Sequence, residues 1–265
     1  MSQSGTPETC KHGSCQCGAV AFDVDLPLRD VVACHCTSCR KQSGHYWAAS
    51  SVPKTAFRLT RDEGLTWYST SAAARRGSCR LCGSLLFWDP TDEDRISFSA
   101  GAIDGPTGLT IAKHIYTDEA GDYYSPEGPP PALTAPGPDR LQASCLCGAN
   151  RFSLPSPVSA VGACHCTQCR KFSGHFTASF ATDEASLDWQ ARALNEYTLP
   201  GGGKQAHCQT CGCRLYFRGA SGHFSVEAGA VDGPTGGRLD GHIFVAWKGD
   251  YYTLDDGLPQ FAQWD

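Results

Sequence analysis

The sequence lacks an excess of basic residues and lacks a long hydrophobic run, and each absence excludes a class of partner. The chain has 22 Lys and Arg residues against 27 Asp and Glu residues, which gives a net charge of −5. Nucleic-acid binding needs clustered basic side chains, so no nucleic-acid partner is expected. No apolar run approaches the ~20 residues of a membrane-spanning helix, so no membrane partner is expected either.

The beginning of the chain, residues 1–8, also lacks the basic segment and apolar core of a secretory signal. We therefore expect a cytoplasmic protein whose thiols stay reduced. In such a compartment, cysteines at short spacing are typical of metal ligands, and extracellular disulfides are the less favoured interpretation.

Cysteine, by contrast, is abundant, with 16 residues. Most of them form one pattern that occurs twice: a Cys-x-Cys pair, a Cys-x-Cys-x-x-Cys group and a Cys-x-x-Cys pair. The pattern comprises Cys15, Cys17, Cys34, Cys36, Cys39, Cys79 and Cys82 in the first half, and Cys145, Cys147, Cys164, Cys166, Cys169, Cys208 and Cys211 in the second. An odd number of thiols per half cannot all pair as disulfides, and the natural division is four plus three.

The two outer pairs of each half supply four thiolates, the number that closes a tetrahedral zinc site. On a strand, the side chains of Cys15 and Cys17 would point to one face. The spacing of Cys79 and Cys82 lets both sulfurs reach one ion from a tight turn. Such a site has no position for a substrate, so we expect these zinc ions to be structural.

The middle group of each half supplies three thiolates from one short segment. Three ligands leave one position open on zinc, and three thiolates make a weak Lewis acid that favours a soft fourth ligand such as an incoming thiolate. The pattern therefore predicts thiol chemistry rather than hydrolysis. The predicted catalytic residues are Cys34, Cys36 and Cys39, and Cys164, Cys166 and Cys169.

Side chains near these groups leave two further questions open. A histidine in the fourth position would close the site and make it structural. The histidines shared by both halves are His35 and His165, His45 and His175, and His114 and His242. Basic pairs directly follow the third cysteine and either offset the negative charge of the metal site or bind substrate carboxylates. These candidate cofactor-binding residues are Arg40, Lys41, Arg170 and Lys171.

The two halves are copies of each other. Cys145 follows Cys15 by 130 residues (145 − 15), and Cys208 follows Cys79 by 129 (208 − 79). Longer words are shared as well, among them Ala-Gly-Ala-[Ile/Val]-Asp-Gly-Pro-Thr-Gly and Gly-Asp-Tyr-Tyr. Two copies of this length indicate duplicated domains rather than a solenoid.

A proline-rich segment at 125–139 separates the copies and reads as a semi-extended spacer. We therefore predict a first domain at residues 1–125, a linker at 126–139 and a second domain at 140–265. The spacer allows the two halves to pack as an intrachain pseudo-dimer.

Apolar residues alternate along several segments of each half, which predicts half-buried strands. The alternating residues are Val20, Phe22, Val24 and Leu26; Ile96, Phe98, Ala100 and Ala102; and Phe224, Val226, Ala228 and Ala230. Long helical periods are absent, so each half is predicted to be a small, mainly β domain with antiparallel sheets and few short helices.

The chain resembles the family of glutathione-dependent formaldehyde-activating enzymes, which includes centromere protein V. The resemblance rests on Cys-His-Cys-x-x-Cys-Arg-Lys-x-x-Gly, Cys-x-x-Cys-Gly and Gly-x-[Ile/Val]-Asp in both halves. It implies two tandem zinc-bound β-tent domains, the fold shared with methionine-R-sulfoxide reductases and a Rab-binding chaperone. It also implies two Zn²⁺ ions per domain, one structural at each four-cysteine set and one at each three-cysteine set.

The resemblance further implies a carbon–sulfur lyase like S-(hydroxymethyl)glutathione synthase, which joins formaldehyde and glutathione. We predict a zinc-dependent lyase that handles thiol–aldehyde adducts, with glutathione as the thiol cosubstrate and formaldehyde or a related small carbonyl as the aldehyde. The alternative is a non-catalytic, zinc-scaffolded binding module. In the second half Gln142-Ala143-Ser144 replaces His12-Gly13-Ser14, which makes glutathione specificity less secure there than in the first half.

Overall fold

The computed structural model describes residues 9–132, 138–158 and 160–263. The N-terminal residues 1–8, on which the expected lack of a secretory signal rests, lie outside the described residues, as do linker residues 133–137. Within the described part of the chain, no helix is long and apolar enough to cross a membrane.

Each half consists of a three-stranded sheet, a seven-stranded sheet and one short α-helix within the described ranges. In the first half the small sheet has the order β1-β2-β5 (Cys10–Ser14, Ala21–Asp25, Phe57–Arg61). The large sheet has the order β10-β3-β4-β9-β8-β7-β6 (Ile111–Ile115, Val31–Cys34, Trp47–Pro53, Arg95–Ser99, Leu85–Pro90, Ala74–Cys79, Leu65–Ser71). Helix α1 (Thr37–Ser43) connects β3 to β4.

The second half repeats this topology. Its small sheet has the order β11-β12-β15 (Arg140–Ser144, Arg151–Pro155, Asp188–Ala191). Its large sheet has the order β16-β17-β18-β19-β14-β13-β20 (Leu194–Thr198, Lys204–Cys208, Arg214–Arg218, Phe224–Glu227, Thr177–Ala181, Val161–Cys164, Leu239–Ile243). Helix α2 (Thr167–Ser173) is the counterpart of α1, and short 3-10 turns lie at η1 (Lys54–Ala56), η2 (Ala100–Ala102), η3 (Thr117–Glu119), η4 (Glu184–Ser186), η5 (Ala228–Ala230) and η6 (Val245–Trp247).

The predicted fold class, mainly β in two similar halves, is confirmed. One pairing in each large sheet differs from the antiparallel prediction, because β10 pairs with β3 and β20 pairs with β13 in parallel. Alternation of apolar residues shows that a segment is a strand, but it carries no information on the direction of the neighbour.

The strands β9 and β19 end earlier than the alternation predicted. Ala100–Ala102 and Ala228–Ala230 form 3-10 turns instead, and both turns leave the sheet to contact the other half. Gly101 N donates to Gly174 O at 2.9 Å, and Gly229 N donates to Gly44 O at 2.8 Å. A Cβ at Gly101 would lie 2.6 Å from Arg170 O, so only glycine permits this approach.

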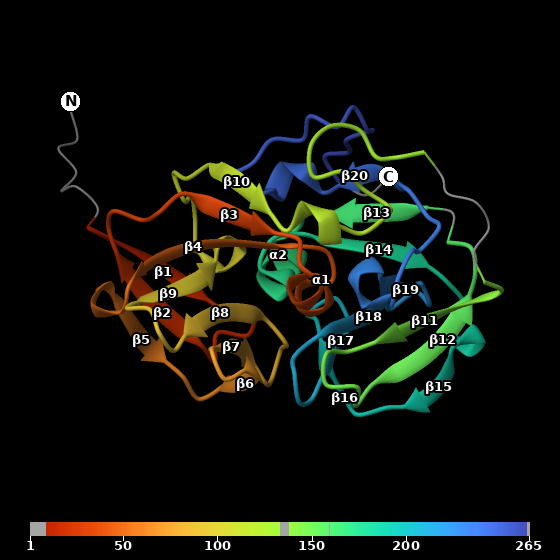
Figure 1. The fold of residues 1–265 in the computed structure, drawn as a ribbon, viewed down its shortest axis with the longest axis horizontal. Helices are drawn as coiled ribbons and strands as arrows, with labels where there is room; N and C mark the ends of the chain where they lie inside the picture. Colours follow the sequence, from red (N-terminus) through yellow and green to blue (C-terminus); the bar gives the residue numbers. More distant parts are fainter. Residues whose placement is uncertain (1–8, 133–137, 159, 264–265) are drawn as a thin grey trace.

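The two halves lie side by side, with α1 and α2 at their contact (Figure 1). The shared words hold the halves together reciprocally. Asp250 accepts from Thr107 N at 3.0 Å and Gly108 N at 2.8 Å, and Asp122 accepts from Thr235 N and Gly236 N at 2.8 Å each. The Gly-Asp-Tyr-Tyr word of each half therefore caps the Gly-Pro-Thr-Gly turn of the other.

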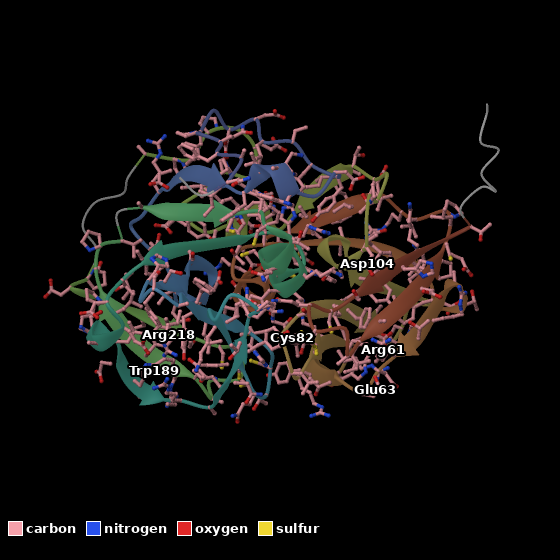
Figure 2. All side chains as sticks on the ribbon, turned by 180° about the vertical axis from the view of Figure 1, so that it is seen from behind. Arg61, Glu63, Cys82, Asp104, Trp189 and Arg218 are labelled. Carbon is pink, nitrogen blue, oxygen red and sulfur yellow. The ribbon has the colours of Figure 1, made fainter. Side chains whose placement is uncertain are left out.

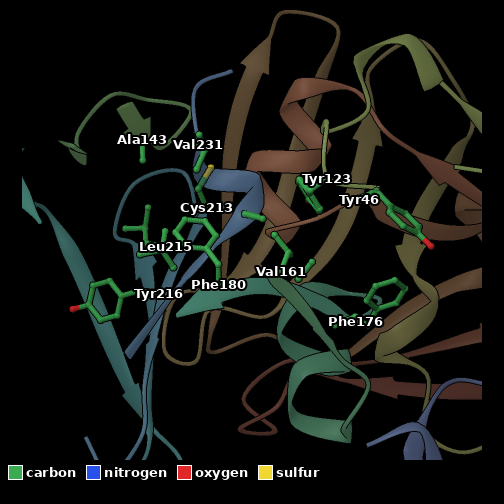
Figure 3. Close-up of a cluster of buried hydrophobic side chains, with 14 of the residues drawn as sticks. Tyr46, Tyr123, Ala143, Val161, Phe176, Phe180, Cys213, Leu215, Tyr216 and Val231 are labelled. Atoms are coloured by element: carbon green, nitrogen blue, oxygen red, sulfur yellow. The ribbon is translucent and has the colours of Figure 1, made fainter. Parts of the chain in front are cut away.

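The largest hydrophobic core runs through this contact. It contains Tyr46 and Tyr123 of the first half together with Val161, Phe176 and Phe180 of the second (Figure 3). A separate core around Phe22 and other apolar residues of the first half packs between the two sheets of that half. The shared core means that neither half buries all of its apolar surface alone.

Candidate metal centres

The first four-cysteine cluster forms where two tight turns meet. Cys15 and Cys17 lie in the turn after β1, while Cys79 ends β7 and Cys82 lies in the turn that follows. The prediction that Cys15 and Cys17 lie on a strand is wrong: Gly18 N donates to Cys15 O at 3.1 Å and closes the turn. Both sulfurs still reach one point, because the turn replaces the strand in presenting them.

The distances between sulfurs fit a metal ion rather than a disulfide. Cys15 Sγ lies 3.5 Å from Cys17 Sγ, which lies 3.7 Å from Cys79 Sγ. A tetrahedral zinc with bonds of ~2.3 Å holds sulfurs about 3.8 Å apart, whereas a disulfide is ~2.05 Å long. All 16 cysteines are free thiols. The donor set and its spacing therefore fit zinc.

The second half builds the same cluster from the same turns. Cys145 Sγ lies 3.5 Å from Cys147 Sγ, which lies 3.6 Å from Cys208 Sγ. All four sulfurs of each cluster, including Cys82 and Cys211, lie within 4.8 Å of one another. Figure 2 shows Cys82 near the middle of the molecule, close to the other half.

Cys213 lies outside both clusters of the second half, and Ser84 holds its position in the first half (213 − 129). Its Sγ accepts a hydrogen bond from Leu146 N at 3.4 Å. In the first half Ser84 Oγ accepts from Gln16 N at 3.0 Å. Both side chains therefore hold the residue between the two cysteines of the Cys-x-Cys turn.

The three-cysteine clusters lie at the junction of a strand and a helix. Cys34 ends β3, Cys36 caps α1 and Cys39 lies in its first turn, with Cys34 Sγ 3.6 Å from Cys36 Sγ. The three sulfurs lie within 4.8 Å of one another, as do those of the second-half counterparts Cys164, Cys166 and Cys169.

Each three-cysteine cluster concentrates negative charge on its middle thiol. Hydrogen bonds from Cys34 and then Cys39 lower the pKa of Cys36 far below that of a free thiol. Hydrogen bonds from Cys164 and Cys169 likewise lower the pKa of Cys166. A thiolate is the form that binds zinc, so each cluster presents a ready ligand at neutral pH.

The candidate histidines point elsewhere. The groups of metal-ligating side chains found in the described ranges contain cysteine only. His35 Nδ1 lies 2.6 Å from Tyr124 Oη, and its Nε2 lies 2.9 Å from His114 Nδ1. Both nitrogens of His165 are engaged in the same way, with Tyr252 and His242. The geometry gives no support to a site closed by histidine.

These histidines instead join buried tyrosines in a network between the halves. His45 Nδ1 lies 2.9 Å from Tyr123 Oη, and His175 lies 2.9 Å from the hydroxyls of both Tyr251 and Tyr46. The network borders a cavity of about 440 Å³. Tyr123 and Tyr251 were not predicted as part of a site, although the repeated Gly-Asp-Tyr-Tyr word could have indicated them; Tyr46 lies outside that word.

Acidification is expected to destabilise this network. Burial lowers the pKa of His45 and His175 well below the usual value. Below pH ~6.5 the unfolded chain binds protons that the folded chain does not, so stability falls as pH falls, by up to about 1.4 kcal/mol per pH unit for each histidine. Urea unfolding between pH 7 and 5.5 should show this slope, and His175→Gln should make it shallower. An unchanged slope in the variant would show that His175 is not buried in its neutral form.

The basic pairs after the third cysteine reach across to the other half. Lys41 Nζ donates to Ser144 O at 2.8 Å and pairs with Asp232, the aspartate of the second Gly-x-[Ile/Val]-Asp word. Lys171 Nζ donates to Ser14 O at 3.0 Å and pairs with Asp104 at 2.5 Å.

The two arginines make matching contacts. Arg40 Nη1 donates to Val231 O and Arg170 Nη1 to Gly101 O, each at 3.0 Å. Binding of substrate carboxylates by these four residues stays a prediction.

The second three-cysteine cluster opens into a cavity of about 510 Å³. This volume falls within the range of small-molecule sites, ~300–1,000 Å³. Apolar side chains such as Phe217 and Ile243 line it together with polar ones such as Thr177, Gln205 and Glu227. The arrangement can enclose a small molecule with one end at the three sulfurs.

Comparison with known proteins identifies a family whose pattern matches both halves of the chain. The family described as glutathione-dependent formaldehyde-activating enzyme matches residues 10–119 and again residues 140–247. An uncharacterised lyase from Schizosaccharomyces pombe is 27% identical over 120 residues, which cover 43% of this chain and 82% of that protein. A crystal structure of a Rhodobacter sphaeroides protein is 24% identical, with a TM-score of 0.34, and covers 39% of this chain and 98% of its own.

Proposed function

Because the chain belongs to the family of glutathione-dependent formaldehyde-activating enzymes and carries the family domain twice, we propose that it is a zinc-dependent carbon–sulfur lyase acting on thiol–aldehyde adducts. The proposed substrates are glutathione and formaldehyde or a related small carbonyl. The observation that carries the proposal is a three-sulfur cluster, Cys164, Cys166 and Cys169, at the wall of a cavity of ligand size.

Zinc bound by three thiolates supplies a position for a thiol sulfur and favours its thiolate form. The chain's own residues supply the rest. The end of β13 and the start of α2 place the three sulfurs in the wall of the cavity, so a thiol inside the cavity can reach them. Phe217, Ile243 and the other apolar lining residues form an apolar part of the cavity wall for the carbon atoms of the substrates.

The proposed reaction needs no redox partner. A carbon–sulfur bond forms between the thiolate and the carbonyl carbon, and the proton released by the thiol ends on the carbonyl oxygen. In the reverse direction the carbon–sulfur bond breaks and the hydroxyl proton returns to the thiolate. Glu227 is 3% exposed and burial raises the pKa of its carboxyl to about 8, so it can hold a proton near the cavity at neutral pH.

The proposal predicts both metal content and turnover. Purified protein should contain about four zinc ions per chain, one for each cysteine cluster. Exchange NMR with glutathione and formaldehyde should show faster formation or breakdown of S-(hydroxymethyl)glutathione than in buffer. The acceleration should disappear in the Cys36→Ala/Cys166→Ala double variant, while Cys10→Ala, outside all clusters, should keep it.

Two results would contradict the proposal. A zinc content of two per chain that does not rise when zinc is added would show that the three-cysteine clusters do not bind zinc. Exchange no faster than in buffer, together with no glutathione binding by calorimetry, would favour a zinc-scaffolded binding module without turnover.

A further inference from the structure

The two three-cysteine clusters have different surroundings. In the second half Thr177, Gln205 and Phe217 line the cavity of about 510 Å³ beside the cluster. The repeat offsets place Trp47 at the position of Thr177 (177 − 130) and Arg76 at the position of Gln205 (205 − 129). The same offset places Trp88 at the position of Phe217 (217 − 129). Every one of these first-half residues is larger than its counterpart.

The larger side chains pack against the first cluster. Trp47 is 5% exposed and belongs to one small core with Cys39 and Leu85, against which Cys34, Cys36 and Trp88 are packed. Its indole Nε1 donates to Ser99 Oγ at 2.8 Å, which fixes the ring in place. Cys39 is only 2% exposed, whereas its counterpart Cys169 is partly exposed; the other two cysteines of each cluster are partly exposed in both halves.

Arg76 is only 7% exposed and lies against the sulfurs of the first cluster. Its Nη2 donates to Cys39 Sγ at 3.4 Å, and its guanidinium carbon lies 6.0 Å from the centre of the Trp47 ring. Nε and Nη1 have no hydrogen-bond partner in the part of the chain that the structure describes. Attraction to the cysteine sulfurs is therefore the main interaction that holds this buried cation.

The cavity of the second half contains polar atoms that lack partners. Glu227 Oε2 and Gln205 Oε1 are buried and have no hydrogen-bond partner among the described residues. Their side chains are 3% exposed and line the cavity. The first-half counterpart of Glu227 is Ser99 (227 − 128), which is satisfied by Trp47 and by Leu85 O at 2.7 Å. Gln205 Oε1, an unpaired buried acceptor, indicates a ligand that donates a hydrogen bond, such as an amide N–H group of a peptide-like thiol.

We propose that only the three-cysteine cluster of the second half takes a thiol substrate, and that Trp47 and Arg76 close the cluster of the first half. This inference rests on the proposed function and specifies which half performs it. It reverses the expectation that the first half is the more secure match for glutathione. The replaced residues 142–144 lie at the end of β11 and do not line the cavity, whereas Trp47 and Arg76 alter the site itself.

Calorimetric titration of the zinc-loaded full chain with glutathione tests the proposal through stoichiometry. The wild-type protein should bind one glutathione per chain. Trp47→Thr/Arg76→Gln, which copies the second half, should bind two. Thr177→Trp, which copies the first half, should bind none, while the size-matched control Thr177→Val should still bind one.

The outcomes separate the two proposals. Two glutathiones per wild-type chain, or one that survives Thr177→Trp, would overturn the closed first site but leave the proposed function standing. No binding by the wild-type protein or by any variant would overturn the proposed function.

A second measurement remains decisive even if the variants fail to fold. Native wild-type protein is treated with iodoacetamide, and modification of each cysteine is followed by peptide mass spectrometry. Cys169 should be modified at least about tenfold faster than its counterpart Cys39, because an alkylating agent needs the same access as a thiol. Equal rates for these two cysteines would overturn the inference.

Discussion

Replacing Cys17 with alanine is expected to unfold the first half of the protein. A structural zinc contributes about 10–16 kcal/mol in apparent terms, and total stability is typically about 5–15 kcal/mol. Cys79 and Cys82 are fully buried, so three remaining thiols would be left without an ion in an apolar setting. Circular dichroism should show loss of β structure, and zinc analysis should show a lower metal content than in the wild-type protein.

Cys36→Ala is the matched comparison. It removes one ligand from a three-cysteine cluster that joins one strand to one helix, and should leave the fold intact. The four-cysteine cluster, by contrast, ties the turn after β1 to the end of β7, since Cys79 follows Cys17 by 62 positions. Identical thermal melts for Cys17→Ala and Cys36→Ala would mean that the structural and reactive roles have been assigned to the wrong clusters.

Lys41→Met is expected to lower the free energy of unfolding by about 3 kcal/mol. The lysine is 7% exposed. Across the contact between the halves, its ammonium group donates hydrogen bonds to Ser144 O and Ala230 O and forms an ion pair with Asp232. Methionine keeps the length of the side chain but leaves these acceptors without a donor. Removing one partner of a buried pair destabilises the folded state strongly, because the other partner stays buried and unpaired. Urea unfolding followed by tryptophan fluorescence measures the change.

An exposed ion pair provides the control for this prediction. Arg58 pairs with Asp25, and the side chains are 48% and 44% exposed, so Arg58→Met should lower the free energy of unfolding far less than Lys41→Met does. Lys171→Met in the second half then tests the predicted substrate contact. If Lys171 binds a glutathione carboxylate, the variant loses glutathione affinity. If Lys171 binds only Asp104 and Ser14, the variant loses stability and keeps its affinity for glutathione.

The sequence predicted what depends on local spacing. The Cys-x-Cys and Cys-x-x-Cys pairs could be grouped as four plus three because each pair needs only one turn to point two sulfurs the same way. The strand β2 could be predicted because Phe22 and Val24 are buried on one face while Ala21, Asp23 and Asp25 between and beside them are not fully buried. Family membership followed from the same short words.

The sequence did not predict contacts between residues that are far apart in the chain. Nothing in the spacing of Arg40 and Lys41 shows that they reach residues 189–191 positions away. The parallel pairing of β10 and β20 was not predicted either, because these two strands have the composition of any edge strand. The change from Thr177 to Trp47 is visible in the sequence, but its effect depends on how much volume the neighbouring sheet leaves beside the sulfurs.

The reciprocal capping by Asp122 and Asp250 also has a consequence for synthesis on the ribosome. The turn at Thr107 of the first half is completed by Asp250, 143 residues later. At about 5–20 residues per second, roughly 7–30 s pass between the emergence of the two partners. During this interval the first half has unsatisfied turn amides and exposes the part of its core that Val161 and Phe176 later cover. The nascent chain is therefore most vulnerable to proteases and aggregation when it is half made, and binding of zinc at Cys15, Cys17, Cys79 and Cys82 is the event that can protect it before the second half arrives.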